Sequence, residues 1–192
     1  MPLALIAVGS GVASAGSGFS GNAPGTVSCS GVSGSVSFKP PLTLTGGGTS
    51  VKAKGVISGC HASNPSVSIT DGKFKAAITS SGSGCAGLAG GTTSETFTIK
   101  WKGDFGGSKA KFTSTTVVVK GSTIVTNGAG DEGFELPNPS NEPNGATATG
   151  SFGTVSSSES FAYTNETAGQ FSSACGTGIK KVTLASGQLN SL

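Results

Sequence analysis

The sequence predicts an all-β protein. It is expected to be an antiparallel β-sandwich of about nine to ten short strands, with one short helix near the C-terminus and a closed β-barrel as the alternative architecture. Apolar residues alternate with Ser, Thr and Lys in many short runs, which is the period of a half-buried strand. The chain has 33 glycines among 192 residues, which supply turns between such runs. Helical spacing occurs mainly in Asn165–Cys175.

The stretch Glu95–Lys120 predicts a central β-hairpin. Apolar and polar residues alternate over Phe97–Trp101, which includes the only tryptophan. The glycine-rich segment Gly103–Gly107 predicts the reversal between the two strands. The apolar phase then shifts by one residue before Val117, which predicts a β-bulge near Ser114–Thr116.

The first residues, Met1–Ala15, predict a signal peptide with a truncated n-region. The run is apolar and ends in Ala-Ser-Ala, the small-x-small pattern of a cleavage site. It is shorter than the roughly 20 apolar residues of a transmembrane helix, so no transmembrane span is expected. The mature chain, Gly16–Leu192, is expected to form one domain that begins with a flexible Gly/Ser/Pro-rich arm at residues 16–26.

The first half of the domain predicts strands separated by proline and glycine. The alternation over Val27–Phe38 predicts a strand that Pro40-Pro41 ends, because proline has no N–H to donate to a ladder. Val51–Ile57 predicts the next strand, and a loop is expected at residues 59–65. Asp71-Gly72 lies between two alternating runs and predicts a hairpin turn.

The second half predicts a long loop and the helix. Asn127–Gly145 contains several prolines and acidic residues and is expected to be the longest irregular segment. Asn165–Cys175 predicts a helix in which Asn165 is the N-cap and Gly176 follows the last turn. Further strands are expected at Ala146–Phe152, Phe161–Tyr163 and Val182–Leu184.

The four cysteines predict two disulfides. An even number of widely spaced cysteines without a Cys-x-x-Cys pair is typical of an oxidising compartment rather than of zinc or redox chemistry. Four cysteines allow three pairings. Cys29 opens one strand and Cys60 ends the next long one, so an antiparallel pair would bring them together. We therefore predict the bonds Cys29–Cys60 and Cys85–Cys175.

The chain resembles the secreted, Gly/Thr/Ser-rich β-domain proteins of high-GC Gram-positive bacteria. The resemblance covers most of the mature chain. It depends on the signal sequence, the strand with Cys29, the loops at Cys60 and Cys85, and the Asn165–Cys175 segment. These motifs contain no catalytic signature, so the resemblance implies an exported β-protein and no particular activity.

Titratable groups are too few and too scattered for an enzyme to be expected. The net charge is only +3, arginine is absent, and no basic segment is interleaved with aromatic residues, so a nucleic-acid partner is not expected. His61 is the only histidine, and the sequence contains no Gly-x-Ser-x-Gly nucleophile elbow. We therefore expect no catalytic residues and no cofactor other than the weak calcium candidate described next.

Two groups of charged residues are candidate binding sites. The carboxylates of Asp131, Glu132 and Glu135 offer the oxygen ligands that Ca²⁺ prefers, although their spacing matches no EF-hand and a solvated loop is the more ordinary interpretation. The second group is expected on the outward face of the central hairpin, where it would attract an anionic polymer such as wall teichoic acid, an acidic glycan or lipid headgroups. Protection of strand edges and solubility are the more ordinary roles of such lysines. The group comprises Lys100, Lys102, Lys109 and Lys111.

The expected function is that of a secreted or cell-envelope protein without catalytic activity. It would be a structural or binding module, with an anionic envelope polymer or a second copy of itself as partner. The alternative is an oligomeric β-protein that forms a pore or an extracellular filament, because Gly-rich strands with Ser/Thr faces suit edge-to-edge assembly or a polar lumen. A secreted hydrolase is the least supported class, given the small supply of titratable groups.

His61→Ala is expected to leave any activity found for this protein unchanged, because the sequence provides no nucleophile-base-acid set around this residue. Wild type and variant are compared in the same assay. A loss of more than about a hundredfold, which is typical for removal of a general base, would contradict this expectation.

Overall fold

The computed structural model describes residues 19–80, 84–85, 93–122, 124–126, 131–136, 146–153 and 160–189. The expected signal peptide, residues 1–15, lies outside the described residues. The elements are β1 (Ser20–Gly21), β2 (Val27–Leu42), β3 (Ser50–Ala62), β4 (Val67–Ser80), β5 (Thr93–Phe105), β6 (Ser108–Lys109), β7 (Lys111–Phe112), β8 (Thr115–Ser122), β9 (Ile124–Thr126), β10 (Asp131–Leu136), β11 (Ala146–Thr149), β12 (Ser160–Thr167), α2 (Ala168–Cys175) and β13 (Ile179–Gln188).

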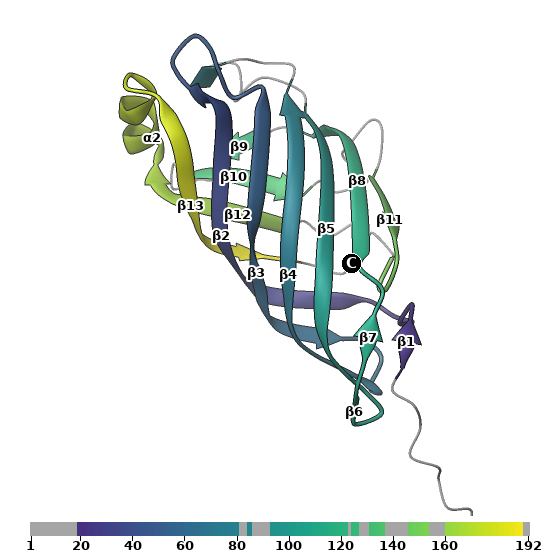
Figure 1. The fold of residues 1–192 in the computed structure, drawn as a ribbon. Coiled ribbons are helices and arrows are strands. Elements are labelled where there is room, and N and C mark those ends of the chain that lie inside the picture. Colours follow the sequence, from purple (N-terminus) through teal and green to yellow (C-terminus); the bar gives the residue numbers. More distant parts are fainter. Residues whose placement is uncertain are drawn as a thin grey trace, which may run out of the picture.

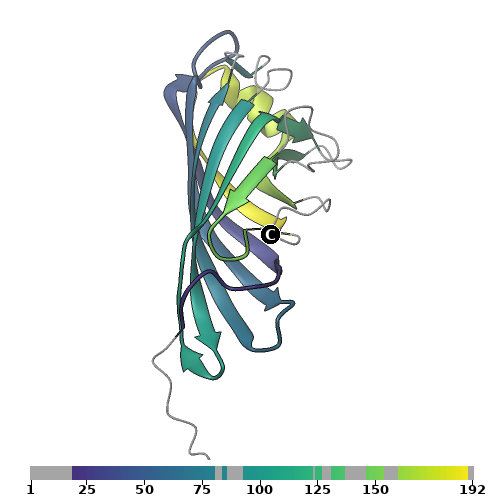
Figure 2. The ribbon, with the colours of Figure 1, turned by 90° about the vertical axis from the view of Figure 1, so that its right-hand side faces the viewer.

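The expected fold class, an antiparallel all-β protein with one short helix near the C-terminus, is confirmed. Most strands form a single sheet of order β11-β8-β5-β4-β3-β2-β13-β12-β10-β9, with β6 also paired to β5. This sheet curls so that β12 and β10 lie behind β2–β5, and two layers face each other as in a sandwich (Figures 1 and 2). Among the described strands, no pairing joins the ends β11 and β9, so the alternative of a closed barrel is not realised.

Large aromatic rings lie over glycines on the inner face of this sheet. Gly55 pairs with Phe74, and a Cβ on Gly55 would lie 2.7 Å from the Phe74 ring. Phe74 stacks on Phe97 with ring centroids 5.1 Å apart. Gly72 faces Trp101 in the same way, since a Cβ there would lie 3.0 Å from the indole. The glycines thus provide the space in which the rings reach the close packing of a protein interior.

A buried polar network joins the sheet to the N-terminal segment. The Trp101 indole N–H donates to the Thr115 hydroxyl at 2.7 Å, and that hydroxyl donates to the carbonyl of Ser151. The Ser151 hydroxyl donates to the Gly21 carbonyl at 2.7 Å and accepts from the Ala23 N–H at 3.3 Å. Both hydroxyls are therefore donor and acceptor at once, which satisfies polar groups that are shielded from water.

Phe152 turns into the core beside this network. Its φ of 57° is rare for a bulky residue, and its side chain is fully buried. The ring meets Trp101 edge to face at 5.6 Å and Phe112 at 5.7 Å between centroids. The expected strand Ala146–Phe152 is therefore wrong in its last part, because β11 ends at Thr149 and the chain bends so that Phe152 fills the space above the indole.

The described part of the segment expected to be a flexible arm, residues 16–26, is docked on β7. β1 pairs with β7 in parallel, and the Lys111 N–H donates to the Phe19 carbonyl at 2.8 Å. The Phe19 ring stacks on Phe105 at 4.6 Å and lies 5.8 Å from Phe112. The packing of Phe19 on these two rings therefore holds the segment against the domain.

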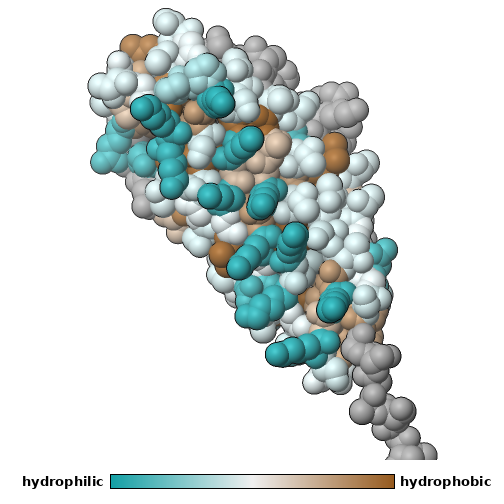
Figure 3. All heavy atoms as spheres, in the orientation of Figure 1, coloured by the Kyte–Doolittle hydropathy of each residue, from teal (hydrophilic) through white to brown (hydrophobic). Residues whose placement is uncertain are grey.

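The outer face of β2–β5 is polar. Its outward positions hold mostly Ser, Thr and Lys, and the space-filling view shows this face as largely hydrophilic (Figure 3). Val56 is its large exposed apolar residue among those described, at 38% exposure, and Val118 of the neighbouring β8 is 37% exposed. The period-two pattern therefore separates an apolar inner face from a solvated outer face.

Asp71-Gly72 does not form the expected hairpin turn, because β4 passes straight through it. The register against β5 shifts between Ile69 and Asp71, and Thr70 is the extra residue of a β-bulge. The bulge shifts the alternation of inward and outward side chains by one residue. Ile69 and Phe74 therefore both point inward, although residues five positions apart in a regular strand lie on opposite faces. An alternation interrupted by one residue therefore resembles two strands joined by a turn.

Two expected strand ends were also placed too early. β2 continues through Pro40-Pro41 to Leu42. Its register against β13 shifts between Ser37 and Leu42, so the prolines occupy an irregular stretch where no ladder N–H is required of them. The loop expected at residues 59–65 is shorter, because β3 stays paired to β2 as far as Ala62.

The central hairpin is present but its second strand is interrupted. The turn lies at Gly106-Gly107, both with positive φ, whereas Gly103 stays inside β5, where its backbone packs against Ser68. After the turn, β6 pairs briefly with β5, β7 leaves to pair with β1, and β8 rejoins β5. The bulge expected near Ser114–Thr116 is instead this break between β7 and β8, and the register shift of β5 against β8 lies near Ser94.

The second half also differs from expectation in detail. The segment expected to be irregular, Asn127–Gly145, contains β10, which pairs with both β9 and β12. Asn165 does not cap the helix, because β12 extends past it to Thr167 and α2 begins only at Ala168. The helix ends at Cys175 before Gly176, as predicted.

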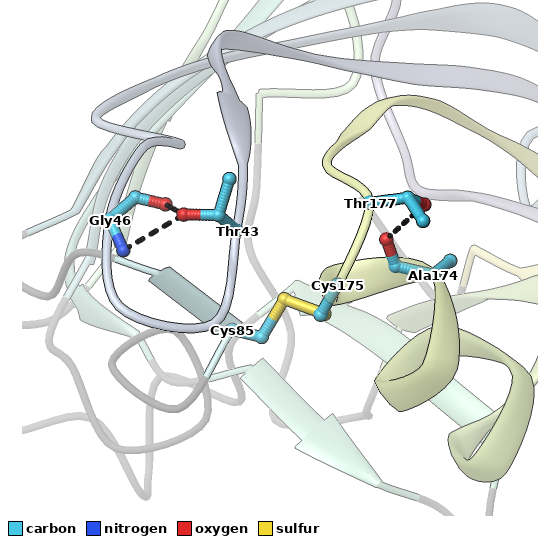
Figure 4. Close-up of a disulfide and its surroundings, with 6 residues drawn as sticks. All are labelled: Thr43, Gly46, Cys85, Ala174, Cys175 and Thr177. Carbon is cyan, nitrogen blue, oxygen red and sulfur yellow. Dashed lines mark hydrogen bonds between the residues drawn. A yellow bond between two sulfur atoms is a disulfide. The ribbon is translucent and has the colours of Figure 1, made fainter.

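Both predicted disulfides, Cys29–Cys60 and Cys85–Cys175, are confirmed. Cys29 and Cys60 are direct partners in the β2–β3 ladder, as the antiparallel argument required. Cys175 is fully buried at the end of α2, where it is bonded to Cys85 (Figure 4). The N–H of Cys85 donates to the Thr43 carbonyl at 2.8 Å. The second disulfide therefore fastens the helix to the connection between β4 and β5, which is hydrogen-bonded in turn to the connection between β2 and β3.

Thr115→Val is expected to lower the free energy of unfolding by about 1–3 kcal/mol, because the isosteric side chain leaves the buried Trp101 N–H without an acceptor. The measurement is urea unfolding followed by tryptophan fluorescence. Thr116→Val, at the neighbouring half-buried position, is the matched control and should change stability by no more than about 0.5 kcal/mol. Equal effects of the two substitutions would show that the network contributes nothing.

Candidate anion-binding surface

Three neighbouring strands of the front layer each present two lysines to solvent. Because β3, β4 and β5 alternate strictly at these positions, each Lys-x-Lys segment places both lysines outward and the residue between them inward. All six are exposed. We call this set the lysine stripe, and it comprises Lys52 and Lys54 of β3, Lys73 and Lys75 of β4, and Lys100 and Lys102 of β5.

The strand register brings these lysines together in one oblique line. Lys54 pairs directly with Lys75, and Lys73 pairs directly with Lys100. From Lys52 to Lys102, the line goes two residues along one strand, then across to the neighbouring strand, and repeats these two steps. Hydrophilic side chains accordingly form a band that runs from upper left to lower right over β3, β4 and β5 (Figures 1 and 3).

Little negative charge opposes the stripe. Ten of the twelve lysines but only three of the nine acidic residues precede position 131. Of these three, Glu95 is buried on the inner face, Asp71 forms an ion pair with Lys102 at 3.3 Å, and Asp104 is paired with Lys109 in the β5–β6 ladder. The Lys102 side chain is 76% exposed, so this pair is screened by solvent and stabilises the fold little.

Two shallow hollows lie along the stripe. Their volumes are about 250 and 270 Å³, and Lys75 borders both. A bound chain that crosses both hollows would contact lysines of all three strands. The first hollow is lined by Lys73, Phe74, Lys75, Thr98 and Lys100, and the second by Ser37, Lys52, Ala53, Lys54, Lys75 and Ala76.

The four lysines selected from the sequence do not all lie together. Lys100 and Lys102 belong to the stripe, whereas Lys109 and Lys111 are exposed on β6 and β7, beyond the turn. The lysines of β3 and β4 were not grouped with them. The signal available in the sequence was the repetition of Lys-x-Lys in three successive strands, at 52–54, 73–75 and 100–102.

The other candidate residues lie elsewhere. His61 is exposed near the end of β3, where its partner in β2 is Ser28. Asp131, Glu132 and Glu135 all lie in β10, and their side chains are outside the described part of the structure. Within that described part, no group of three or more His, Cys, Asp or Glu side chains is arranged to hold a metal ion.

Neither the helix nor the comparisons suggest another site. None of the helices in the described ranges has the length and hydropathy needed to cross a membrane. Comparison of the chain with protein-family models, with curated proteins and with solved structures found no match. The lysine stripe is therefore the feature from which a function is proposed.

Lys75→Glu is expected to raise the free energy of unfolding by up to about 1 kcal/mol, because it replaces a repulsive cross-strand pair with an attractive one opposite Lys54. Urea unfolding at low and high ionic strength measures this, and the gain should shrink at high salt. Lys39→Glu is the control, since Lys39 pairs with Ser50 and changes the net charge equally. A gain no larger than that of the control would mean that the stripe lysines do not repel one another.

Proposed function

We propose that this protein is an exported, non-catalytic binding protein of the cell envelope and that it holds an anionic polymer against the lysine stripe. The observation that carries the proposal is the pair of directly opposed lysine couples on β3–β4 and β4–β5. Like charges directly opposite in a sheet are destabilising. An anion between the ammonium groups would remove this repulsion, which gives binding a physical benefit beyond net charge.

Edge protection does not account for these lysines. Lysines that prevent aggregation are useful on edge strands, where unpaired N–H and C=O groups are exposed. β3, β4 and β5 each have a hydrogen-bonded neighbour on both sides. Solubility alone would be served equally well by lysines at scattered positions, and therefore does not explain why they face one another.

Export is supported by the covalent chemistry of the chain. Two disulfides and no free cysteine are typical of proteins that fold in an oxidising compartment. The apolar residues 1–15 with their Ala-Ser-Ala ending fit a secretion signal. An exported protein meets the anionic polymers of the envelope, which are the partners that a lysine-rich surface attracts.

Binding to this surface should be weak and sensitive to salt. Lysine acts as a point charge and cannot form the two-pronged contacts of arginine. An exposed ion pair contributes at most about 1 kcal/mol and is screened within about 10 Å at 0.1 M salt. Six such contacts give affinities in the micromolar range or weaker, and the affinity should fall as salt is added.

The full chain is expected to co-sediment with cell walls purified from a Gram-positive bacterium at low salt and to be released at high salt. Changing the six stripe lysines to Gln should abolish sedimentation. The chain offers an equal control, because its other six lysines (39, 109, 111, 120, 180 and 181) can be changed to Gln with the same loss of charge.

The two sextuple variants decide between a located site and general charge. Loss of sedimentation in the stripe variant alone supports the proposal. If both variants sediment as the wild type does, the lysines have no role in binding. If both lose sedimentation equally, net charge and not the stripe is responsible, and the proposal fails.

A further inference from the structure

We infer that the partner is a linear phosphodiester polymer with hydroxylated, non-aromatic spacers, and that a single chain of it lies lengthwise along the lysine stripe. This inference rests on the proposed function and specifies its ligand. The stripe is nowhere more than two lysines wide, and its six lysines follow one another in a single oblique zigzag, which follows from the register of β3, β4 and β5. A line of positive charge matches a linear anionic polymer better than it matches a compact anion or a flat anionic surface.

The spacing of the lysines fits a polymer with one charge per short repeat. Steps across the stripe are about 4.8 Å, and steps along a strand are about 6.7 Å for two residues. Two residues of extended polypeptide contain six backbone bonds, the same number as one repeat of a three-carbon polyol phosphate. A phosphodiester also has two unesterified oxygens, so one phosphate can accept from both ammonium groups of an opposed lysine couple.

The stripe has a defined length. Lys102 is level with Ser58, which lies six residues beyond Lys52 on β3. The stripe therefore extends about 20 Å along the strands and about 10 Å across them, or roughly 22 Å end to end. About four phosphates of such a polymer, with about 6.7 Å between neighbours, span this distance.

The residues beside the stripe favour hydroxylated spacers over nucleobases. Many outward positions beside the stripe are Ser or Thr, such as Thr96 and Thr98 on one side and Ser33 and Ser37 on the other, although Val56 and Ala77 also border it. Hydroxyls of this kind exchange hydrogen bonds with polyol hydroxyls. The outward positions of β3, β4 and β5 hold no Phe, Tyr or Trp, whereas single-stranded nucleic acids are bound by stacking of their bases on aromatic rings.

The same surface does not suit a lipid bilayer. Membrane-binding faces combine basic residues with large apolar side chains that enter the headgroup region. On the outward face of β3–β5, Val56 is the exposed large apolar residue, at 38% exposure. Attraction to a bilayer would then depend on charge alone and would not require the lysines to follow a line.

The test exchanges one lysine and one threonine within β5. Lys100→Thr combined with Thr96→Lys leaves composition, net charge and the outward face unchanged, but moves one charge about 13 Å along β5 and leaves a gap between Lys73 and Lys102. Binding to poly(glycerol phosphate) of defined length is measured by calorimetry at low salt. We expect the exchange variant to bind at least about fivefold more weakly than wild type, because the line is broken between Lys73 and Lys102.

A second measurement uses the wild type alone, so that it does not depend on any variant folding. Affinity should rise as the polymer is lengthened from about two to about four repeats and then level off. Longer polymers should gain only the small factor that comes from having more positions at which they can bind. Phosphatidylglycerol vesicles and single-stranded DNA, at equal phosphate concentration, should bind more weakly than the polymer.

The outcomes separate this inference from the proposed function. If the stripe-to-Gln variant loses wall binding but the exchange variant binds poly(glycerol phosphate) like the wild type, the lengthwise arrangement is wrong while the proposed function stands. Equal or stronger binding to vesicles or to DNA would also overturn the inference. If the wild type binds neither walls nor polymer, the proposed function itself fails.

Discussion

The hydrogen bond from the Trp101 indole to Thr115 is the contact on which the arrangement of this domain depends. The indole fits only because Gly72 leaves room beneath it, and its N–H is satisfied only because β8 places Thr115 within 2.7 Å. Thr115 in turn holds the turn that carries Ser151, and Ser151 holds the N-terminal segment through Gly21. Four parts of the chain that are distant in sequence are thereby joined at one buried point.

The core and the proposed binding surface have a common origin in the alternation of the strands. The inward residue of each Lys-x-Lys segment, such as Phe74 or Trp101, packs in the core, and the lysines beside it are held at fixed outward positions. The order of the stripe is therefore inherited from the packing of the aromatic rings. A register error of one residue would bury lysines and expose aromatic side chains, so the surface and the core exclude such an error together.

The fold class, the inward residues and both disulfides were predictable because they depend on local alternation and on simple strand pairing. The bulge at Thr70 was not, since one additional residue in an alternating run has the same local pattern as the turn that Asp71-Gly72 suggested. The start of the helix was misplaced because β12, which is paired on both sides at Phe161–Tyr163, continues past Asn165 as far as Thr167. The stripe was only half recognised, because the neighbours of Lys100 and Lys102 come from strands whose register the sequence does not specify.

The Cys85–Cys175 disulfide closes a covalent ring in which the two cysteines are 90 residues apart in sequence. This ring includes β5, β8, β10 and β12, and hence two of the stripe lysines. A protease that cuts one peptide bond within the ring leaves both fragments attached through sulfur. The nicked molecule would remain one covalent molecule until the disulfide is reduced, and β5 would remain beside β4. In the presence of a protease, the protein would thus tolerate a cut that would divide an unlinked chain.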